Sequence, residues 1–280
     1  MAKNRWRERQ IAAAAKAVRL IGHLPGGNSL LRQVQTLPAT SGLYRAAVGY
    51  RRPFANLTEA KAAIAGYEAL GHEGNDTVQH HLALSTSPRP SDYPAFFHLQ
   101  PLASTLHTVF DLGGNAGNLF YCYAPRLPWP TDLKWQVLDL PANMDAGRKI
   151  AAERSAHQLT FTGDWSHASA ADLLILSGSL HYMEKPLADM LRELPALPKH
   201  ILINRTPLTD GEPIAVIQVG SGFRVACMIY NRAALVESLE EIGYRTVDQW
   251  KAPELSIEIP GYPQHSIPAY SGIFLSRNPL

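Results

Sequence analysis

The sequence has few cysteines and no long apolar run. Its two cysteines, Cys122 and Cys227, each lie inside an apolar stretch, LFYCYA and RVACMIY. Two cysteines so placed form neither a disulfide framework nor a metal-ligand pattern, so we expect both in the core of a protein of the reducing cytoplasm. No apolar run approaches the roughly 20 residues that a membrane-spanning helix needs. Lys16 and Arg19 interrupt the N-terminal apolar segment, which argues against a secretory signal.

Charge is sparse and unevenly placed. Charged residues make up 18% of the chain and apolar residues 46%, as in an ordinary soluble globular protein. Residues 1–52 hold ten lysines and arginines but a single acid, Glu8, whereas the whole chain carries only +2. A basic arm can attract anionic lipid, nucleic acid or an anionic substrate. We favour the simpler interpretation of a solvated helix face and a contact between two copies, with no nucleic-acid partner.

The N-terminal third has helical periodicity and then an irregular segment. Helices are expected at residues 5–24, 29–35 and 57–70. Residues 72–94 are irregular and contain His72, His80 and His81. Adjacent histidines point to different faces of a helix, so we expect no metal site there. We interpret residues 1–95 as an N-terminal helical extension or cap, in which residues 72–94 are the part that meets the substrate.

From residue 96 onward, strand and helix patterns alternate. Strands are expected at residues 109–112, 135–138, 158–161, 172–176, 200–204, 246–250 and 271–276. Helices are expected at residues 96–106, 118–124, 143–154, 186–194 and 231–242. The alternation predicts an α/β domain, residues 96–280, with a mostly parallel sheet covered on both faces. An insert at about 207–230 is expected to form a hairpin over the sheet edge.

The most informative stretch follows the first of these strands. The strand ends at Leu112 and runs directly into Gly113 and Gly114, with Gly117 opening the next helix. Glycines belong where the backbone needs positive φ or must lie close to a ligand. The dinucleotide fingerprint requires glycine at the positions of Asn115 and Asn118, so it is broken, and no Gly-Lys-Ser/Thr follows. A turn that binds a phosphate-free ligand and a turn without a ligand both remain open.

Ligands of open α/β sheets bind at the carboxyl ends of the strands. Asp139 ends the second strand, where its carboxylate can accept hydrogen bonds from ribose hydroxyls or can cap the next helix. Asp164 follows the third strand, where it can contact a ligand or cap residues 165–168. Trp165 offers a ring face for stacking.

The later strand ends add a base and a cation. His181 is the group near the fourth strand best suited to act as a general base at neutral pH, although a structural role is an equal alternative. Arg205, after the fifth strand, can pair with an anionic substrate or with a buried carboxylate. Tyr262, His265 and Tyr270, near the last strand, are candidate substrate contacts or exposed loop residues.

Five segments together resemble class I S-adenosylmethionine-dependent methyltransferases: DLGGNAGN, VLDLP, FTGDW, LSGSLHYME and ILINRTPL. The resemblance covers about residues 55–278 and is closest to a branch often encoded beside bacterial surface-polysaccharide genes. It implies a Rossmann-like, seven-stranded, mostly parallel sheet with helices on both faces, and S-adenosylmethionine as cofactor. The residues implied to contact the cofactor are Asp111, Gly113, Gly114, Asn115, Gly117, Asp139, Leu140, Asp164, Trp165 and Ser177.

The resemblance also implies a reaction. In it, Asp139 binds the ribose, Leu140 packs on the adenine, Asp164 accepts from the adenine amino group and Ser177 lies beside the methionine end. The segment at His181 resembles the Leu-His-Asp-Trp segment of small-molecule O-methyltransferases, although Tyr182-Met183 replaces Asp-Trp. We therefore expect O-methylation of a small-molecule or sugar hydroxyl. The alternatives are an N- or C-methyltransferase, a non-catalytic nucleoside-binding protein and, least favoured, an oxidoreductase.

Overall fold

The computed structural model describes residues 2–36, 47–65, 87–220 and 223–277. The chain forms two compact units. Unit 1 comprises residues 1–71, 209–231 and 256–268, and unit 2 comprises residues 72–208, 232–255 and 269–280. This division differs from the expected one at residue 95, because chain segments from the C-terminal half belong to unit 1. His72, His80 and His81 lie outside the described residues.

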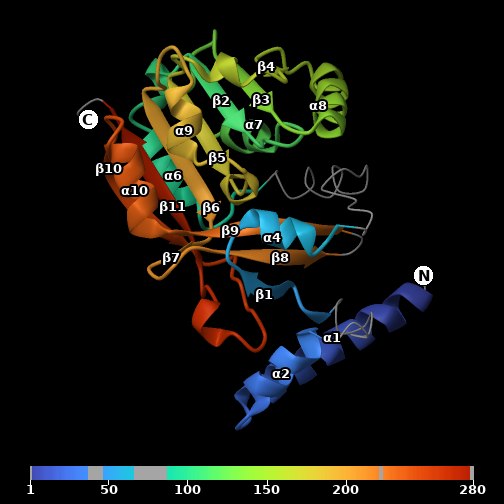
Figure 1. The fold of residues 1–280 in the computed structure, drawn as a ribbon. Helices are drawn as coiled ribbons and strands as arrows, with labels where there is room; N and C mark the ends of the chain where they lie inside the picture. The colour runs from blue at the N-terminus through green and yellow to red at the C-terminus, as the bar shows by residue number, and fades with distance from the viewer. Residues whose placement is uncertain (1, 37–46, 66–86, 221–222, 278–280) are drawn as a thin grey trace. The chain divides into compact units, whose positions relative to one another are not determined.

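Unit 2 is built on a seven-stranded sheet with the order β10-β11-β6-β5-β2-β3-β4 (Figure 1). The strands are β2 (Thr108–Leu112), β3 (Lys134–Leu138), β4 (Leu159–Phe161), β5 (Leu173–Ser177), β6 (His200–Thr206), β10 (Arg245–Ala252) and β11 (Tyr270–Ser276). Strands β2 to β6 are parallel, and β11 runs antiparallel to both β6 and β10. The expected seven-stranded, mostly parallel sheet is confirmed.

The strand order reverses at β2. From β2 the chain continues outward to β3 and β4, then returns to pair β5 with the other side of β2. Loops that leave the carboxyl ends of β2 and β5 therefore diverge, and this switch point is where open α/β sheets bind ligands. We call the row of strand ends from Phe161 to Thr206 the carboxyl edge.

The strands carry apolar residues on both faces of the sheet, so helices cover both faces. The helices of unit 2 are α6 (Asp92–Leu99), α7 (Asn118–Tyr123), α8 (Pro141–Glu153), α9 (Leu187–Arg192) and α10 (Arg232–Glu240). Leu99 of α6 and Phe120 of α7 pack in one core cluster with Val109 and Trp135 of the sheet. Figure 1 shows α9 in front of the sheet and α6 behind it. Cys122 belongs to the same core cluster, as expected.

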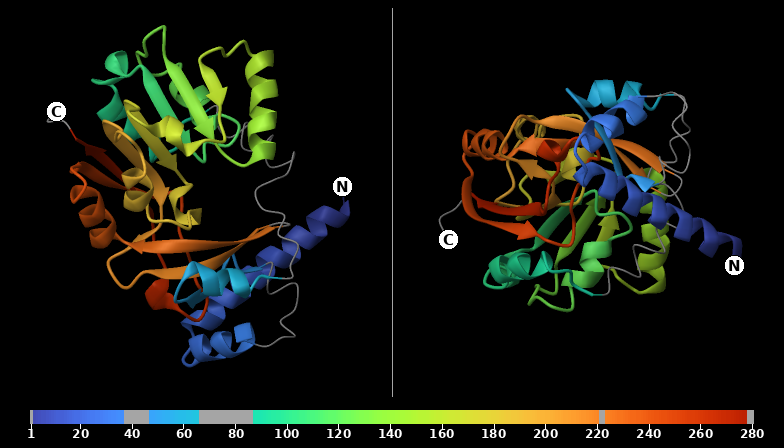
Figure 2. Two further views of the ribbon diagram at one scale, coloured as in Figure 1. Left: turned by 45° about the horizontal axis from the view of Figure 1, so that its top comes forward. Right: turned by 90° about the horizontal axis from the view of Figure 1, so that it is seen from below.

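Unit 1 contains a second, four-stranded sheet with the order β1-β8-β9-β7. Its strands are β1 (Tyr50–Phe54), β7 (Leu208–Thr209), β8 (Ile214–Gly220) and β9 (Phe223–Asn231), and its helices are α1 (Ala2–His23), α2 (Gly27–Thr36) and α4 (Leu57–Ala62). Helix α4 lies against the β8–β9 hairpin (Figure 2). Ala60 packs there against Ala215, Ile217 and Ala226. Cys227 of β9 is fully buried, so both cysteines are core residues as expected.

The expected hairpin forms at β8 and β9, and β8 pairs with β1, for example Gln218 with Tyr50. The N-terminal region expected to be a helical extension also contains a strand, β1. Its sequence YRRPF contains two arginines and Pro53, which an edge strand tolerates. None of the helices in the described ranges has the length and apolar character needed to cross a bilayer.

Candidate active site at the carboxyl edge

The glycine-rich turn is left-handed at three positions. Gly113, Asn115 and Gly117 have φ angles of 76°, 54° and 86°. Asparagine tolerates this region because its short side chain can bond locally, and Asn115 Oδ1 accepts from the Ala116 N–H at 2.8 Å. The turn therefore bends sharply from β2 into α7.

Packing also restricts two of these positions to glycine. A Cβ on Gly113 would lie 2.2 Å from Cβ of Ser179, and one on Gly117 would lie 2.5 Å from Cδ2 of Leu159. Ser179 is itself fixed, since its Oγ donates to the Leu112 carbonyl at 2.5 Å. The turn is thus held between the segment after β5 and strand β4, directly at the switch point.

Five of the six N–H groups of residues 113–118, all but that of Gly114, donate to acceptors in or near the turn. Gly113 donates to the Leu138 carbonyl at 2.7 Å, and Gly117 and Asn118 donate to the Gly114 carbonyl at 3.0 and 3.2 Å. The Asn115 N–H donates to Asp139 Oδ2 at 2.8 Å. A phosphate at a helix N-terminus needs such N–H groups to point at it. This turn is therefore suited to a ligand without phosphate.

Asp139 lies beside the turn, and its two carboxylate oxygens accept different numbers of hydrogen bonds. Its Oδ1 accepts from the Leu140 N–H at 2.7 Å and from Asn143 Nδ2 at 2.6 Å. Among the described residues, only the Asn115 N–H donates to its Oδ2. A carboxylate oxygen has two lone pairs, so Oδ2 retains an acceptor site with respect to these residues. Leu140, the next residue, is 41% exposed. Asp139 thus both anchors the turn and presents an oxygen next to an apolar side chain.

Asp111 is a buried acid beneath the turn. It is 1% exposed, and its Oδ2 accepts from Trp135 Nε1 at 3.2 Å. Its Oδ1 has no hydrogen-bond partner within the described ranges. Burial, with a smaller contribution from the Asp139 charge, raises the pKa of Asp111 to about 7, although the Trp135 hydrogen bond opposes the shift. Because its carboxyl packs against Gly114, Asp111 supports the turn from below.

Asp164 and Trp165 follow β4, where Asp164 is a helix cap. Asp164 Oδ1 accepts from the Ser166 N–H at 2.8 Å at the start of the 3-10 helix η2 (Trp165–Ala168). Hydrogen bonds from Ser166 lower the pKa of Asp164. The Trp165 indole donates to the Met190 carbonyl at 3.0 Å, and its ring meets the edge of Phe110. The contacts of both residues with an adenine stay predictions.

Arg205 pairs with buried carboxylates. Its guanidinium lies 2.6 Å from Asp92 Oδ2 and 3.5 Å from Glu254 Oε1, and it donates to Ser177 Oγ at 2.9 Å. The side chain of Arg205 is 8% exposed and that of Asp92 is 2% exposed. Of the two sequence-based alternatives, the buried carboxylate is the one found. Ser177, at the end of β5, is thereby tied to the neighbouring strand.

His181 lies in a tyrosine-lined position after β5, in the 3-10 helix η3 (Leu180–Tyr182). It is 3% exposed. Its ring centroid lies 4.1 Å from that of Tyr182 and 5.9 Å from that of Tyr270. The structure thus brings His181 and Tyr270 together within unit 2, whereas His265 belongs to unit 1.

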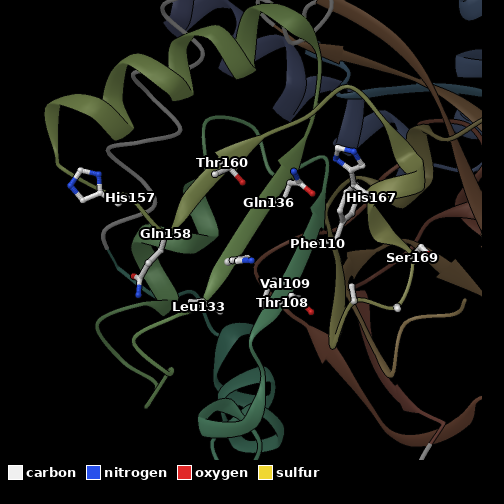
Figure 3. Close-up of a pocket in the computed structure, with 13 residues that line it drawn as sticks. Thr108, Val109, Phe110, Leu133, Gln136, His157, Gln158, Thr160, His167 and Ser169 are labelled. Atoms are coloured by element: carbon white, nitrogen blue, oxygen red, sulfur yellow. The ribbon is translucent and has the colours of Figure 1, made fainter.

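A surface pocket of about 390 Å³ lies away from these residues (Figure 3). Phe110, Gln136 and Thr160 line it and are neighbours in register on β2, β3 and β4. His157 and His167 lie at its borders. The pocket occupies a face of the strands and not their carboxyl ends, so it is separate from the glycine-rich turn.

The sequence did not point to Asp92, Tyr123 or Glu254, which contribute to this site. Asp92 lies in the segment interpreted as irregular, yet it begins α6 and accepts from the Tyr123 hydroxyl at 2.8 Å. An acid at a helix start is ordinarily a solvated cap. Only the structure shows that Asp92 is buried and pairs with Arg205.

No family model and no curated protein matches the sequence. Solved structures are similar in fold. Burkholderia thailandensis 1,6-didemethyltoxoflavin-N1-methyltransferase, solved with 1,6-didemethyltoxoflavin and S-adenosylhomocysteine, is 17% identical over 81% of this chain and 93% of its own, with a TM-score of 0.48. An O-methyltransferase family protein from the same organism is 18% identical over 81% of this chain and 64% of its own, with a TM-score of 0.47. The O-methyltransferase NcsB1 from neocarzinostatin biosynthesis is 17% identical over 72% and 61%, with a TM-score of 0.40. Similarity at this level describes the course of the backbone.

Proposed function

We propose that this chain is an S-adenosylmethionine-dependent methyltransferase of the cytoplasm. One observation carries the proposal. At the switch point, the turn between Gly113 and Gly117 uses all of its N–H groups but that of Gly114 internally, while Asp139 Oδ2 retains an acceptor site beside the exposed Leu140. This combination suits a nucleoside whose sugar hydroxyls donate to a carboxylate better than a phosphate, which needs several N–H groups pointing at it.

The residues fit the cofactor part by part. Asp139 would accept from the ribose hydroxyls, and Leu140 would cover one face of the adenine. Asp164 and Trp165 would lie on the adenine side, at the end of β4. The methionine end would rest between the glycine-rich turn and Ser177.

The cofactor supplies an activated methyl group on a sulfonium. The chain therefore has to align an acceptor with that methyl group and remove its proton. We assign the proton to His181, which Tyr182 and Tyr270 hold in place, and we propose a hydroxyl of a small molecule or sugar as acceptor.

One observation favours a second candidate. At 3% exposure, His181 offers little surface to an acceptor. In an N- or C-methyltransferase no histidine base need act, and the burial of His181 would then reflect a structural role only.

Calorimetry with S-adenosylhomocysteine tests the cofactor assignment. The wild-type protein is expected to bind, and Leu140→Ala is expected to weaken binding by about tenfold, because roughly 1–2 kcal/mol of apolar contact is lost. Val247→Ala, at another exposed apolar residue (39%) on β10, is the matched control and should bind as wild type. Absence of wild-type binding, or equal binding of NADH, would contradict the proposal.

Turnover tests the base. With an acceptor found by screening small-molecule and sugar hydroxyls, His181→Ala should slow methyl transfer by about 10²- to 10⁴-fold while cofactor affinity stays unchanged. Unchanged turnover would make His181 structural and favour the second candidate. Binding without transfer to any acceptor would indicate a non-catalytic nucleoside-binding protein.

A further inference from the structure

A chain of buried polar contacts joins the two sides of the switch point. On one side, the Tyr123 hydroxyl of α7 donates to Asp92 Oδ1 at 2.8 Å. Asp92 Oδ2 lies 2.6 Å from the Arg205 guanidinium, which donates to Ser177 Oγ at 2.9 Å on the other side. We call Tyr123, Asp92, Arg205 and Ser177 the buried polar chain. It connects the helix that follows the glycine-rich turn with the end of β5.

Arg205 has an uncommon backbone conformation, and the neighbouring Asn204 makes hydrogen bonds that fix it. Arg205 has a φ of 53°, which is uncommon for a residue with a side chain. Asn204 holds it there, because Asn204 Oδ1 accepts from the Arg205 N–H at 3.0 Å and Nδ2 donates to the Ser91 carbonyl at 3.1 Å. The Asn204 carbonyl in turn accepts from the Gly178 N–H at 2.9 Å. In this backbone arrangement the guanidinium reaches both Asp92 and Ser177.

Stability alone is a poor explanation for so many buried charges. Removing an ion pair from water is costly, and apolar residues of similar volume often stabilise a protein as well or better. Asp92 is 2% exposed and Tyr123 is fully buried. Burial, reinforced by the Asp92 charge, raises the pKa of Tyr123 well above its ordinary value, so its phenol remains a donor. Directional bonds of this kind fix relative positions, which apolar contacts do less precisely.

We propose that Asp92 and Arg205 are positioning residues that hold α7 and the turn after β5 in one fixed relation. If the proposed function is correct, this relation sets the gap in which the methionine end of the cofactor lies. In this role Arg205 need not contact the acceptor. It acts through Ser177, and Asp92 acts through both Arg205 and Tyr123.

The first test needs no ligand. Tyr123→Phe removes one hydroxyl at the far end of the buried polar chain, and we expect amide hydrogen exchange at Gly178 to become about tenfold faster in the intact protein. The control is Tyr244→Phe, which also removes a buried hydroxyl, one that donates to the Pro198 carbonyl at 2.8 Å. The control should destabilise the protein to a similar degree and leave Gly178 unchanged relative to global unfolding. Equal behaviour of the two variants would overturn the inference.

The second test is a double-mutant cycle on binding of S-adenosylhomocysteine, followed by calorimetry. Tyr123→Phe and Ser177→Ala should each weaken binding by roughly fivefold, and the double variant should be no weaker than the poorer single variant, because both changes break the same connection. Ser177→Ala combined with Tyr244→Phe should be additive. Additivity in both cycles would overturn the inference. A wild-type protein that does not bind would instead refute the proposed function, and the exchange experiment would still decide the positioning role.

Discussion

The buried carboxyl of Asp111 makes folding stability depend on pH in a predictable direction. Its pKa is raised from 3.8 to about 7 in the folded protein, chiefly by burial. The unfolded chain therefore ionises above pH 4, whereas the folded protein ionises only near pH 7. Stability is lost as the pH rises between these values, and the loss levels off above pH 7. The difference of about three pKa units corresponds to about 4 kcal/mol, of which about 3 kcal/mol falls between pH 5 and 8.

Asp111→Asn removes the ionisation and keeps an acceptor for Trp135. Denaturant unfolding of the wild-type protein and of this variant from pH 5 to 8 should show the variant gaining about 3 kcal/mol relative to wild type. The control is Asp145→Asn, at an exposed acid that pairs with Arg148 on the surface of α8, and its difference should stay within about 0.5 kcal/mol of constant. A constant difference between wild type and Asp111→Asn would refute the argument that burial sets this pKa.

Two further changes have clear expected outcomes, each measured by denaturant unfolding. Gly113→Ala should cost about 2–4 kcal/mol, because its Cβ would lie 2.2 Å from Cβ of Ser179 at a φ of 76°, whereas Gly163→Ala, with open space around it, should cost less than about 1 kcal/mol. Asp172→Asn should cost about 2 kcal/mol at neutral pH. Burial raises the pKa of Asp172, but hydrogen bonds from a lysine and two backbone N–H groups outweigh burial, and the net pKa lies below its ordinary value. The cost of Asp172→Asn should therefore disappear as the pH falls below 4. A cost that persisted in acid would show that the lost bonds are not charge-dependent.

Much of unit 2 could be predicted because its strands are buried on both faces. A run such as LLILS in β5 is apolar at every position but the last, and the glycines after Leu112 mark a turn whatever surrounds them. Positions at the strand ends follow from the same alternation, so Asp139 and Ser177 were placed correctly at the carboxyl edge.

What the sequence could not reveal depends on pairing over long distances. The sequence of a hairpin does not identify the strand that pairs with it, so the pairing of β8 with Tyr50 and its neighbours was not predicted. Similarly, the sequence allowed Arg205 to pair with a buried acid or with a substrate. The acid that it pairs with, Asp92, lies 113 positions earlier in the chain. Such contacts form when distant segments pack together, and the local sequence pattern does not predict which segments will do so.

The way β1 and the β8–β9 hairpin share a sheet has a consequence for biosynthesis. A ribosome delivers β1 early, but its partner strand begins only at Ile214, after most of the larger sheet has already been made. The smaller sheet must therefore wait, with Phe54 and Ala60 lacking the hairpin that later covers them. The first part of the protein to be made is therefore among the last to be completed. Deleting the N-terminal residues to isolate the larger unit would leave the β8–β9 hairpin without its partner strand β1.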